Sequence, residues 1–326
     1  HKYASIWLDR GSPLAVWTQA QASALQVAFE AERPDVVVYH AMRYGQPNVA
    51  TQLDALVQAG ATRILILPAY PQYSGTTTAS VLDAVQAWSR TRRAIPEFRF
   101  VNRYHDHPAY IGALARQVCR HWAAHGRGQQ LLMSFHGVPE RTLLLGDPYH
   151  CECHKTARLL AEALELPAGR WKISFQSRFG KAKWIEPATD AVVGQLAREG
   201  VRELDVLCPG FPCDCLETLE EIAIEARELF VRLGGTRFSY IPCLNDSVDA
   251  VQMLQTIAQA HLGGWSSRES PAELDASRRR ALEMGAKLRK FPGHRPSQSR
   301  GGRRAAEPSD RNVAEPPEGG TTSAEA

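Results

Sequence analysis

The chain has 326 residues, a formal net charge of +3 and 44% hydrophobic residues. This length suits two domains of ordinary size, and the apolar content is sufficient for real cores. The charge is near balance and no basic stripe carries interleaved aromatics, so nothing favours nucleic-acid binding. No apolar run reaches about 18 residues and residues 1–20 lack the pattern of a signal peptide, so we expect a cytoplasmic protein without a transmembrane helix.

Apolar runs typical of buried strands alternate with helical patterns along the whole chain. In the first half, strands are expected after Asp35, at 63–67 and at 98–104, and helices at 13–32, 48–59, after the loop 70–77 and at 108–125. In the second half, strands are expected at 131–137, 171–178, 204–210 and 237–242, and helices near 154–166, 187–199, 216–233 and 247–261. Such alternation is the signature of right-handed βαβ units. It predicts an α/β fold with two Rossmann-like, flavodoxin-like domains, each built on a parallel sheet, and a cleft between them.

The polar, glycine-containing sequence HGRGQQ separates the two halves. We expect a first domain at 1–126, a second at 127–245, a helix within 246–265 that packs back across both, and a tail at 266–326. Within the tail, residues 270–286 could form one short amphipathic helix. From about Lys290 the composition is Pro, Gly, Ser, Arg and Glu, which predicts disorder.

The stretch 204–225 joins a buried strand, a turn with Pro209, Gly210 and Pro212, and a helix. Glu217, Glu221 and Glu225 recur on that helix at intervals of four, where like charges repel by a few tenths of a kcal/mol. A solvated helix face is one explanation. The other is functional, because the helix begins at the carboxyl edge of a parallel sheet, where a carboxylate row could guide a cation or carry protons.

Two other second-half strands also end in polar loops. His136 ends the apolar run Leu131–Phe135, where it could accept a proton or ligate a metal, although a lone histidine is often structural. Ser177 and Arg178 offer a hydroxyl and a guanidinium that could bind an acidic substrate, and the alternative for the arginine is a surface pair with an aspartate. Among the tyrosines of the first-half loops, Tyr70, Tyr73 and Tyr104 could stack on a flat ligand or could belong to a core rim.

Seven cysteines without a secretory signal favour reduced thiols or metal ligands over disulfides. Cys151 with Cys153, and Cys213 with Cys215, form two C-x-C pairs, and Cys243 follows a strand. Such a set could bind zinc or a [2Fe–2S] cluster, for example through Cys151, Cys153, Cys243 and one cysteine of the second pair. The usual C-x2-C spacing is absent.

Taken together, nine short motifs resemble those of ferrochelatase, the enzyme family that inserts Fe2+ into protoporphyrin IX in the last step of haem synthesis. The resemblance spans about Tyr3 to Trp265, and the DCLETLEE wording is similar to proteobacterial members. The motifs occur in the family's order: GSPL (11–14), MRYG (42–45), YPQYSGTTT (70–78), SFHGVP (134–139), GDPY (146–149), FQSRFG (175–180), CPGF (208–211), DCLETLEEI (214–222) and IPCLN (241–245).

The resemblance implies roles for individual residues. His136 corresponds to the family's histidine that ligates the metal or accepts protons, and Glu217 to the carboxylate that faces it, with Glu221 and Glu225 forming an acidic row behind. Arg43, Tyr70 and Tyr104 match residues that line the macrocycle pocket or the iron route. Ser177 and Arg178 match the segment near the propionates.

Three departures from the family pattern are visible. About seventy residues normally precede GSPL, including a first strand and the lip over the porphyrin, so the chain resembles an N-terminally truncated member. Cys215 stands in the porphyrin pocket where many members carry a second histidine. Gly75 replaces a cluster cysteine of the mitochondrial enzymes and no cysteine follows Cys243, so the animal-type cluster is not expected.

The predicted function is therefore that of a lyase, a ferrochelatase whose substrates are protoporphyrin IX and Fe2+ and which releases two protons. Peripheral membrane contact is compatible with the sequence. One alternative is a chelatase for another porphyrin such as coproporphyrin. Another is a non-catalytic tetrapyrrole or metal carrier on the same fold.

Overall fold

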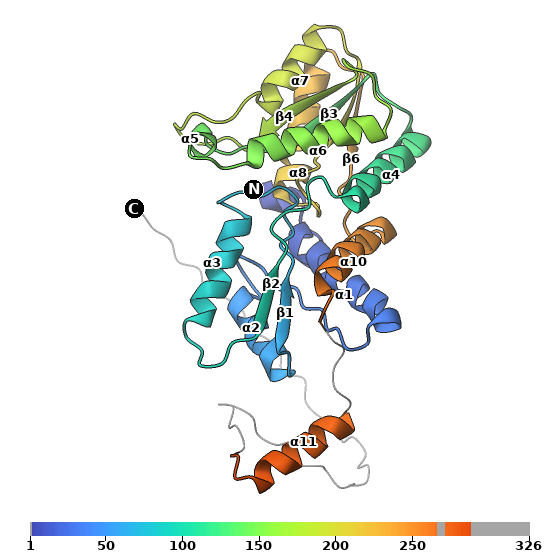
Figure 1. Cartoon of the computed structure of the whole chain (residues 1–326). Helices are drawn as coiled ribbons and strands as arrows, with labels where there is room; N and C mark the ends of the chain where they lie inside the picture. Colours follow the sequence, from blue (N-terminus) through green and yellow to red (C-terminus); the bar gives the residue numbers. More distant parts are fainter. Residues whose placement is uncertain (1, 266–270, 288–326) are drawn as a thin grey trace, which may run out of the picture. The chain divides into compact units, whose positions relative to one another are not determined.

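The computed structural model describes residues 2–265 and 271–287 (Figure 1). The chain divides into two units, His1–Ser267 and Arg268–Ala326. In the second unit the described element is α11 (Pro271–Glu283), which confirms the short helix predicted from the sequence. The disorder predicted from about Lys290 lies outside the described residues.

The first half of the large unit contains a two-stranded parallel sheet, in which Arg63 lies opposite Glu97. Helices flank it, and a small core of Leu53, Ile64, Val85 and Trp88 joins them. The elements are η1 (Lys2–Ser5), α1 (Pro13–Glu32), α2 (Val49–Gln58), β1 (Arg63–Ile66), α3 (Thr78–Ser89), β2 (Glu97–Phe100) and α4 (Pro108–His125).

The strand predicted after Asp35 is wrong. Residues 36–41 carry no strand assignment. Glutamine side chains bind backbone groups of this segment: Gln26 accepts from Val38 N at 2.7 Å, and Gln52 donates to the carbonyl of His40 at 2.6 Å. An apolar run predicts burial in extended backbone, but a ladder also needs a neighbouring strand, and a sequence pattern does not show that neighbour.

The second half contains a four-stranded parallel sheet in the order β4-β3-β5-β6. Its strands are β3 (Gln130–His136), β4 (Trp171–Gln176), β5 (Glu203–Leu207) and β6 (Arg237–Ile241). Its helices are α5 (Glu140–Leu144), α6 (Tyr149–Ala163), α7 (Thr189–Arg198), α8 (Leu216–Leu219), η2 (Glu221–Ala226) and α9 (Arg227–Arg232). The two sheets thus fall on either side of the HGRGQQ break.

Strand β3 is apolar on both faces because helices cover both. Leu131, Met133 and Phe135 belong to the core that contains residues of α4 and α6. Leu132 lies between them in the chain and belongs to the core that contains residues of α7 and α9. Side chains alternate between the faces of a strand, so a strand inside a covered parallel sheet reads as one continuous hydrophobic run.

The segment predicted as one helix over 216–233 is helical, but the type of helix changes along it. It begins as α8, passes through a π-helical segment, η2, and ends as α9. In η2 the amide of Glu225 donates to the carbonyl of Glu220 at 2.9 Å, a bond five residues long. The prediction of one α-helix was therefore wrong over Glu221–Ala226. Such wide turns are frequent at functional sites.

Helix α10 (Val248–Leu262) follows the second sheet and packs against α1 and α4 of the first half (Figure 1). Asp249 pairs with Arg116 and Arg120 of α4, and Gln255 donates to the carbonyl of Ala28 in α1 at 3.2 Å. Because α4 also packs against α6 and β6, these contacts join α1 of the first half to the helices that cover the second sheet. In the part of the chain that the structure describes, no helix is long and apolar enough to cross a membrane.

Candidate functional site

Three adjacent strands deliver polar residues to one edge of the second sheet. His136 ends β3, Ser177 follows β4, and Glu217 lies in the first helix after β5. The strands are parallel and neighbours in the order β4-β3-β5, so their carboxyl ends meet at the same edge. In α/β sheets this edge is where ligands bind. The chain therefore gathers its predicted chemical groups at the expected place.

The ring of His136 is held by the backbone of the next residue. Its Nδ1 lies 2.6 Å from the carbonyl oxygen of Gly137. A carbonyl can only accept, so Nδ1 carries the hydrogen, and in the neutral ring Nε2 keeps its lone pair. The ring of Phe211 lies 6.2 Å away, centroid to centroid. His136 is thus oriented to use Nε2 as a base or ligand.

Ser177 occupies an unusual backbone conformation at the end of β4. Its φ is 59°, in the left-handed region that residues with a Cβ seldom adopt. Its hydroxyl donates to Glu221 Oε2 at 2.6 Å. Strain of this kind persists only where surrounding contacts hold it, and it concentrates at functional sites. The contact joins the loop after β4 to the acidic row.

Arg178 is directed to the surface. Its Nη2 lies 3.1 Å from Asp190 Oδ1, and the side chains are 36% and 70% exposed. This is the surface pair that the sequence left open as an alternative. Such a pair contributes little stability, about 0 to 1 kcal/mol, so the guanidinium could exchange its partner for an acidic ligand.

Glu217 is fixed through its backbone. Gln176 Nε2 donates to the carbonyl oxygen of Glu217 at 2.6 Å. Cys215 caps helix α8, and its amide donates to Thr218 Oγ1 at 3.0 Å. The loop before the helix is anchored by Asp214. It accepts hydrogen bonds from Tyr240 Oη of β6 at 2.5 Å, and from Asn245 Nδ2 at 2.7 Å and Cys243 N at 3.3 Å in the segment after β6.

Two first-half residues lie near this edge. Burial raises the pKa of Tyr70, and the charges of Arg43 and Glu217 also act on it, so these three groups are within electrostatic range. Arg43 donates to the carbonyl of Ser80 at 2.8 Å, and its guanidinium lies 4.6 Å from the centre of the exposed Tyr44 ring. Tyr70 therefore lies within electrostatic range of both Arg43 and Glu217.

Tyr104 and Cys215 are placed differently from the prediction. Tyr104 is 2% exposed and packs edge-on against Tyr110 at 5.5 Å, so it is a core residue and does not line a surface that a macrocycle could touch. Cys215 is 4% exposed, and burial raises the pKa of its thiol. The sequence around Tyr104 did not show that its side chain turns inward, because only packing decides this.

The cysteines do not form the predicted metal centre. Cys151 is exposed and Cys153 is buried on the same helix, because residues two apart on a helix point to different sides. Burial raises the pKa of the thiols of Cys153, Cys215 and Cys243. Among residues 2–265 and 271–287, no three His, Cys, Asp or Glu side chains are grouped to hold a metal ion. These residues do not fit a [2Fe–2S] cluster or a zinc site, and we assign neither.

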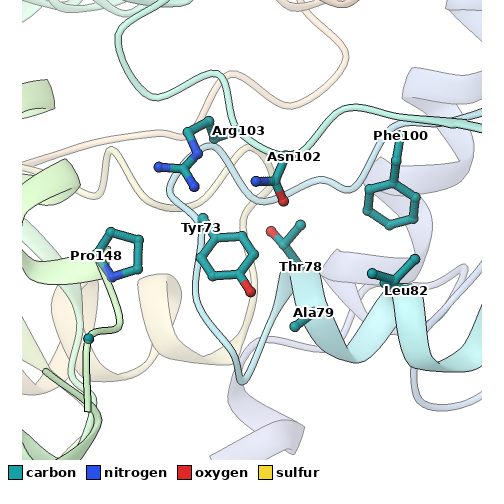
Figure 2. A pocket seen from close by; sticks show the side chains of 9 residues that line it. Tyr73, Thr78, Ala79, Leu82, Phe100, Asn102, Arg103 and Pro148 are labelled. Carbon is teal, nitrogen blue, oxygen red and sulfur yellow. The ribbon is translucent and has the colours of Figure 1, made fainter.

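A separate cavity of about 410 Å³ lies at the N-terminal end of α3 (Figure 2). Its walls mix aromatic, aliphatic and polar side chains. The lining residues are Tyr73, Thr78, Ala79, Leu82, Phe100, Asn102, Arg103, Gly146 and Pro148. It includes none of the predicted catalytic residues, so the sheet edge is the candidate site.

Sequence reasoning missed the residues that connect this site. Gln176 and Gly137 were quoted within motifs but received no role. A buried glutamine needs hydrogen-bond partners. Gln176 ends an apolar strand, and this position could have indicated that its side chain connects neighbouring elements. For Gly137 the signal was weaker, because a glycine after a strand usually indicates only a turn.

Comparison with known proteins agrees with this geometry. The sequence model of the ferrochelatase family matches residues 1–262. The chain belongs to the ferrochelatase family. A ferrochelatase of Polaromonas sp. (strain JS666) is 59% identical over 87% of this chain and 78% of its own length. One of Methylibium petroleiphilum is 58% identical over 87% of this chain and 79% of its own length.

The fold comparison points the same way. SirB from Bacillus subtilis, solved with Fe3+, matches with a TM-score of 0.55 at 13% identity, over 79% of this chain and 96% of that protein. At this identity the match shows the fold alone. The predicted α/β chelatase fold, the ferrochelatase resemblance and the assignment as a lyase are confirmed.

Proposed function

We propose that this chain inserts Fe2+ into protoporphyrin IX at the carboxyl edge of its second sheet, with His136 and Glu217 as the reacting groups. The observation that carries the proposal is the convergence of β3, β4 and β5, which gathers an oriented imidazole, a hydroxyl and a carboxylate row. Curated relatives of 52–59% identity bear the ferrochelatase name, which favours this activity over a carrier function.

The reaction requires that two pyrrole N–H protons leave, that the ring bend, and that the iron lose its water. Because Nδ1 of His136 donates to a backbone carbonyl, Nε2 is available to accept a pyrrole proton. Glu217 supplies a carboxylate for the metal or for the second proton. Glu221, which accepts from Ser177, and Glu225 continue the acidic row and could relay protons outward. Binding at the periphery of the ring would stabilise a bent macrocycle and lower the barrier.

The periphery of the ring would be held by residues of both halves. Tyr70 is supported by its electrostatic proximity to Glu217, Arg43 by its proximity to Tyr70, and Ser177 and Arg178 by their position after β4. Arg178 would exchange Asp190 for a propionate. Cys215 contributes through the start of α8, since its side chain is buried. A cytoplasmic location and a preference for protoporphyrin remain predictions of the sequence.

The central test is His136→Ala. We expect porphyrin to bind with nearly unchanged affinity, while insertion of Fe2+ or of the fluorescent reporter Zn2+ falls by at least about 100-fold, the effect of losing a general base. The matched control is His125→Ala, an exposed histidine whose Nδ1 also lies 3.1 Å from a backbone carbonyl. Full insertion by His136→Ala would refute the assigned role.

The alternatives are separated in the same assay. A carrier would bind porphyrin without producing zinc-porphyrin fluorescence when Zn2+ is added. A chelatase for another tetrapyrrole would convert coproporphyrin in preference to protoporphyrin when both are present in equal amounts, as product analysis would show.

A further inference from the structure

Gln176 is the last residue of β4 and lies opposite His136 in the ladder between β3 and β4. It is 4% exposed, so it is buried beneath the site and does not face a ligand. A buried amide must satisfy its donors and acceptor inside the protein. The hydrogen bonds of Gln176 therefore show which elements it connects.

The side chain of Gln176 joins two strands to the catalytic helix. Ser134 Oγ of β3 donates to Oε1 at 2.7 Å, and Nε2 donates to the carbonyl of Glu217 at 2.6 Å. That carbonyl can only accept, so the amide has one orientation. Behind it, Thr189 Oγ1 lies 2.8 Å from Ser134 Oγ and donates to Ser174 Oγ at 2.9 Å. This buried network fixes the amide in place.

The backbone of Gln176 reaches the histidine. Its carbonyl accepts from the amide of Gly137 at 2.8 Å, and the carbonyl of Gly137 in turn accepts from His136 Nδ1 at 2.6 Å. One buried residue thus connects, through three hydrogen bonds, the ring of His136 with the backbone of Glu217.

We propose that Gln176 is a positioning residue that sets the relative placement of His136 and Glu217 without touching the substrate. The proposal rests on the roles given to those two residues above. Misplacing a reacting group by about 1 Å can cost about 100-fold in rate, so a residue that fixes both groups controls the rate strongly. Porphyrin affinity depends on the periphery of the ring and is not set by Gln176.

The first test is Gln176→Met, which keeps the length of the side chain and removes its hydrogen bonds to Ser134, Cys208 and Glu217. We expect kcat for Zn2+ insertion to fall about 10- to 100-fold, with KM for porphyrin changing less than about threefold. The control is Gln255→Met, a partly buried glutamine that also donates to a backbone carbonyl between two elements, Ala28 O of α1. It should lose stability but keep its kcat and pH profile.

The second test is Gln176→Glu, which preserves shape and can still accept from Ser134. Its carboxylate cannot donate to the carbonyl of Glu217, but its protonated form can. Burial raises the pKa of such a carboxyl, so the donor returns as the pH falls. We expect the ratio of variant to wild-type kcat to rise about tenfold between pH 8 and pH 6. A merely structural role would leave this ratio independent of pH.

The outcomes separate this proposal from the proposed function. Wild-type kcat in a folded Gln176→Met, or a ratio for Gln176→Glu that does not vary with pH, overturns the positioning role while leaving the function intact. Insertion at the wild-type rate by His136→Ala and Glu217→Gln overturns the roles that the proposed function gives to these two residues. Should Gln176→Met not fold, the Gln176→Glu profile decides alone.

Discussion

Gly137→Ala tests whether the close approach of β3 and β4 beside the histidine is required. A Cβ on Gly137 would lie 2.7 Å from the backbone oxygen of Gln176 and 3.2 Å from the ring of Trp184. The first distance is too short for carbon and oxygen, and backbone cannot rotate away as a side chain can. The two segments must therefore separate.

The cost of that separation can be worked out from two contributions. Overpacking costs about 1 to 3 kcal/mol. Stretching the 2.8 Å bond from Gly137 N to Gln176 O leaves polar backbone groups partly unsatisfied, at about 1 to 3 kcal/mol. The overpacking cost and the cost of the stretched hydrogen bond arise from one movement, so they do not add fully. We expect a total loss of about 2 to 4 kcal/mol in the free energy of unfolding. The movement also displaces the carbonyl of Gly137 that holds His136 Nδ1, so the rate of metal insertion should fall at least about tenfold.

Urea unfolding followed by circular dichroism measures the first effect, and zinc-porphyrin fluorescence measures the second. The control is Gly263→Ala, where an added Cβ would lie 3.6 Å from Ala260 O and φ is −52°. This variant should match wild type in both measurements. The reasoning is refuted if Gly137→Ala unfolds within about 0.5 kcal/mol of wild type, the range of neutral substitutions.

Two further substitutions test the contacts that hold the halves and the site loop. Burial alone would raise the pKa of Asp249, but Arg116 and Arg120 outweigh it and keep this pKa below its usual value. The Asp249 carboxylate thus stabilises the folded chain above about pH 4, and this contribution is lost as the pH falls. Asp249→Asn should cost about 1 to 3 kcal/mol at pH 7 and clearly less at pH 3, in urea titrations; an equal cost at both values would contradict this. Tyr240→Phe removes the 2.5 Å bond to Asp214 and should cost about 1 to 2 kcal/mol, while unchanged unfolding would show that the bond contributes nothing.

The sequence was informative where one local pattern decides the outcome. Mainly apolar runs such as Leu131–Phe135 predicted the strands of the second sheet, and polar residues directly after them predicted the edge that carries the site. His136, Ser177 and Glu217 could be placed at one edge because parallel strands end on the same side. The motif order then predicted the ferrochelatase family, which the comparisons confirm.

The errors arose where partners distant in sequence decide the outcome. The run after Asp35 has the pattern of a strand, but its backbone binds glutamine side chains of α1 and α2. Tyr104 follows a strand like Tyr70, yet it turns into the core against Tyr110. The π-helical turn at Glu221–Ala226 leaves the hydrophobic spacing almost unchanged, so periodicity could not reveal it.

The packing of α10 against α1 has a consequence for the synthesis of the chain. Phe29 of α1 shares one core with Met253 and Ile257 of α10. Helix α1 is synthesised early and α10 late, so the apolar face of α1 cannot be fully buried until α10 has been made. At elongation speeds of about 5 to 20 residues per second, the ribosome needs on the order of 10 to 50 s to make the residues between them. Throughout that interval the nascent first half exposes the apolar face that α10 later covers.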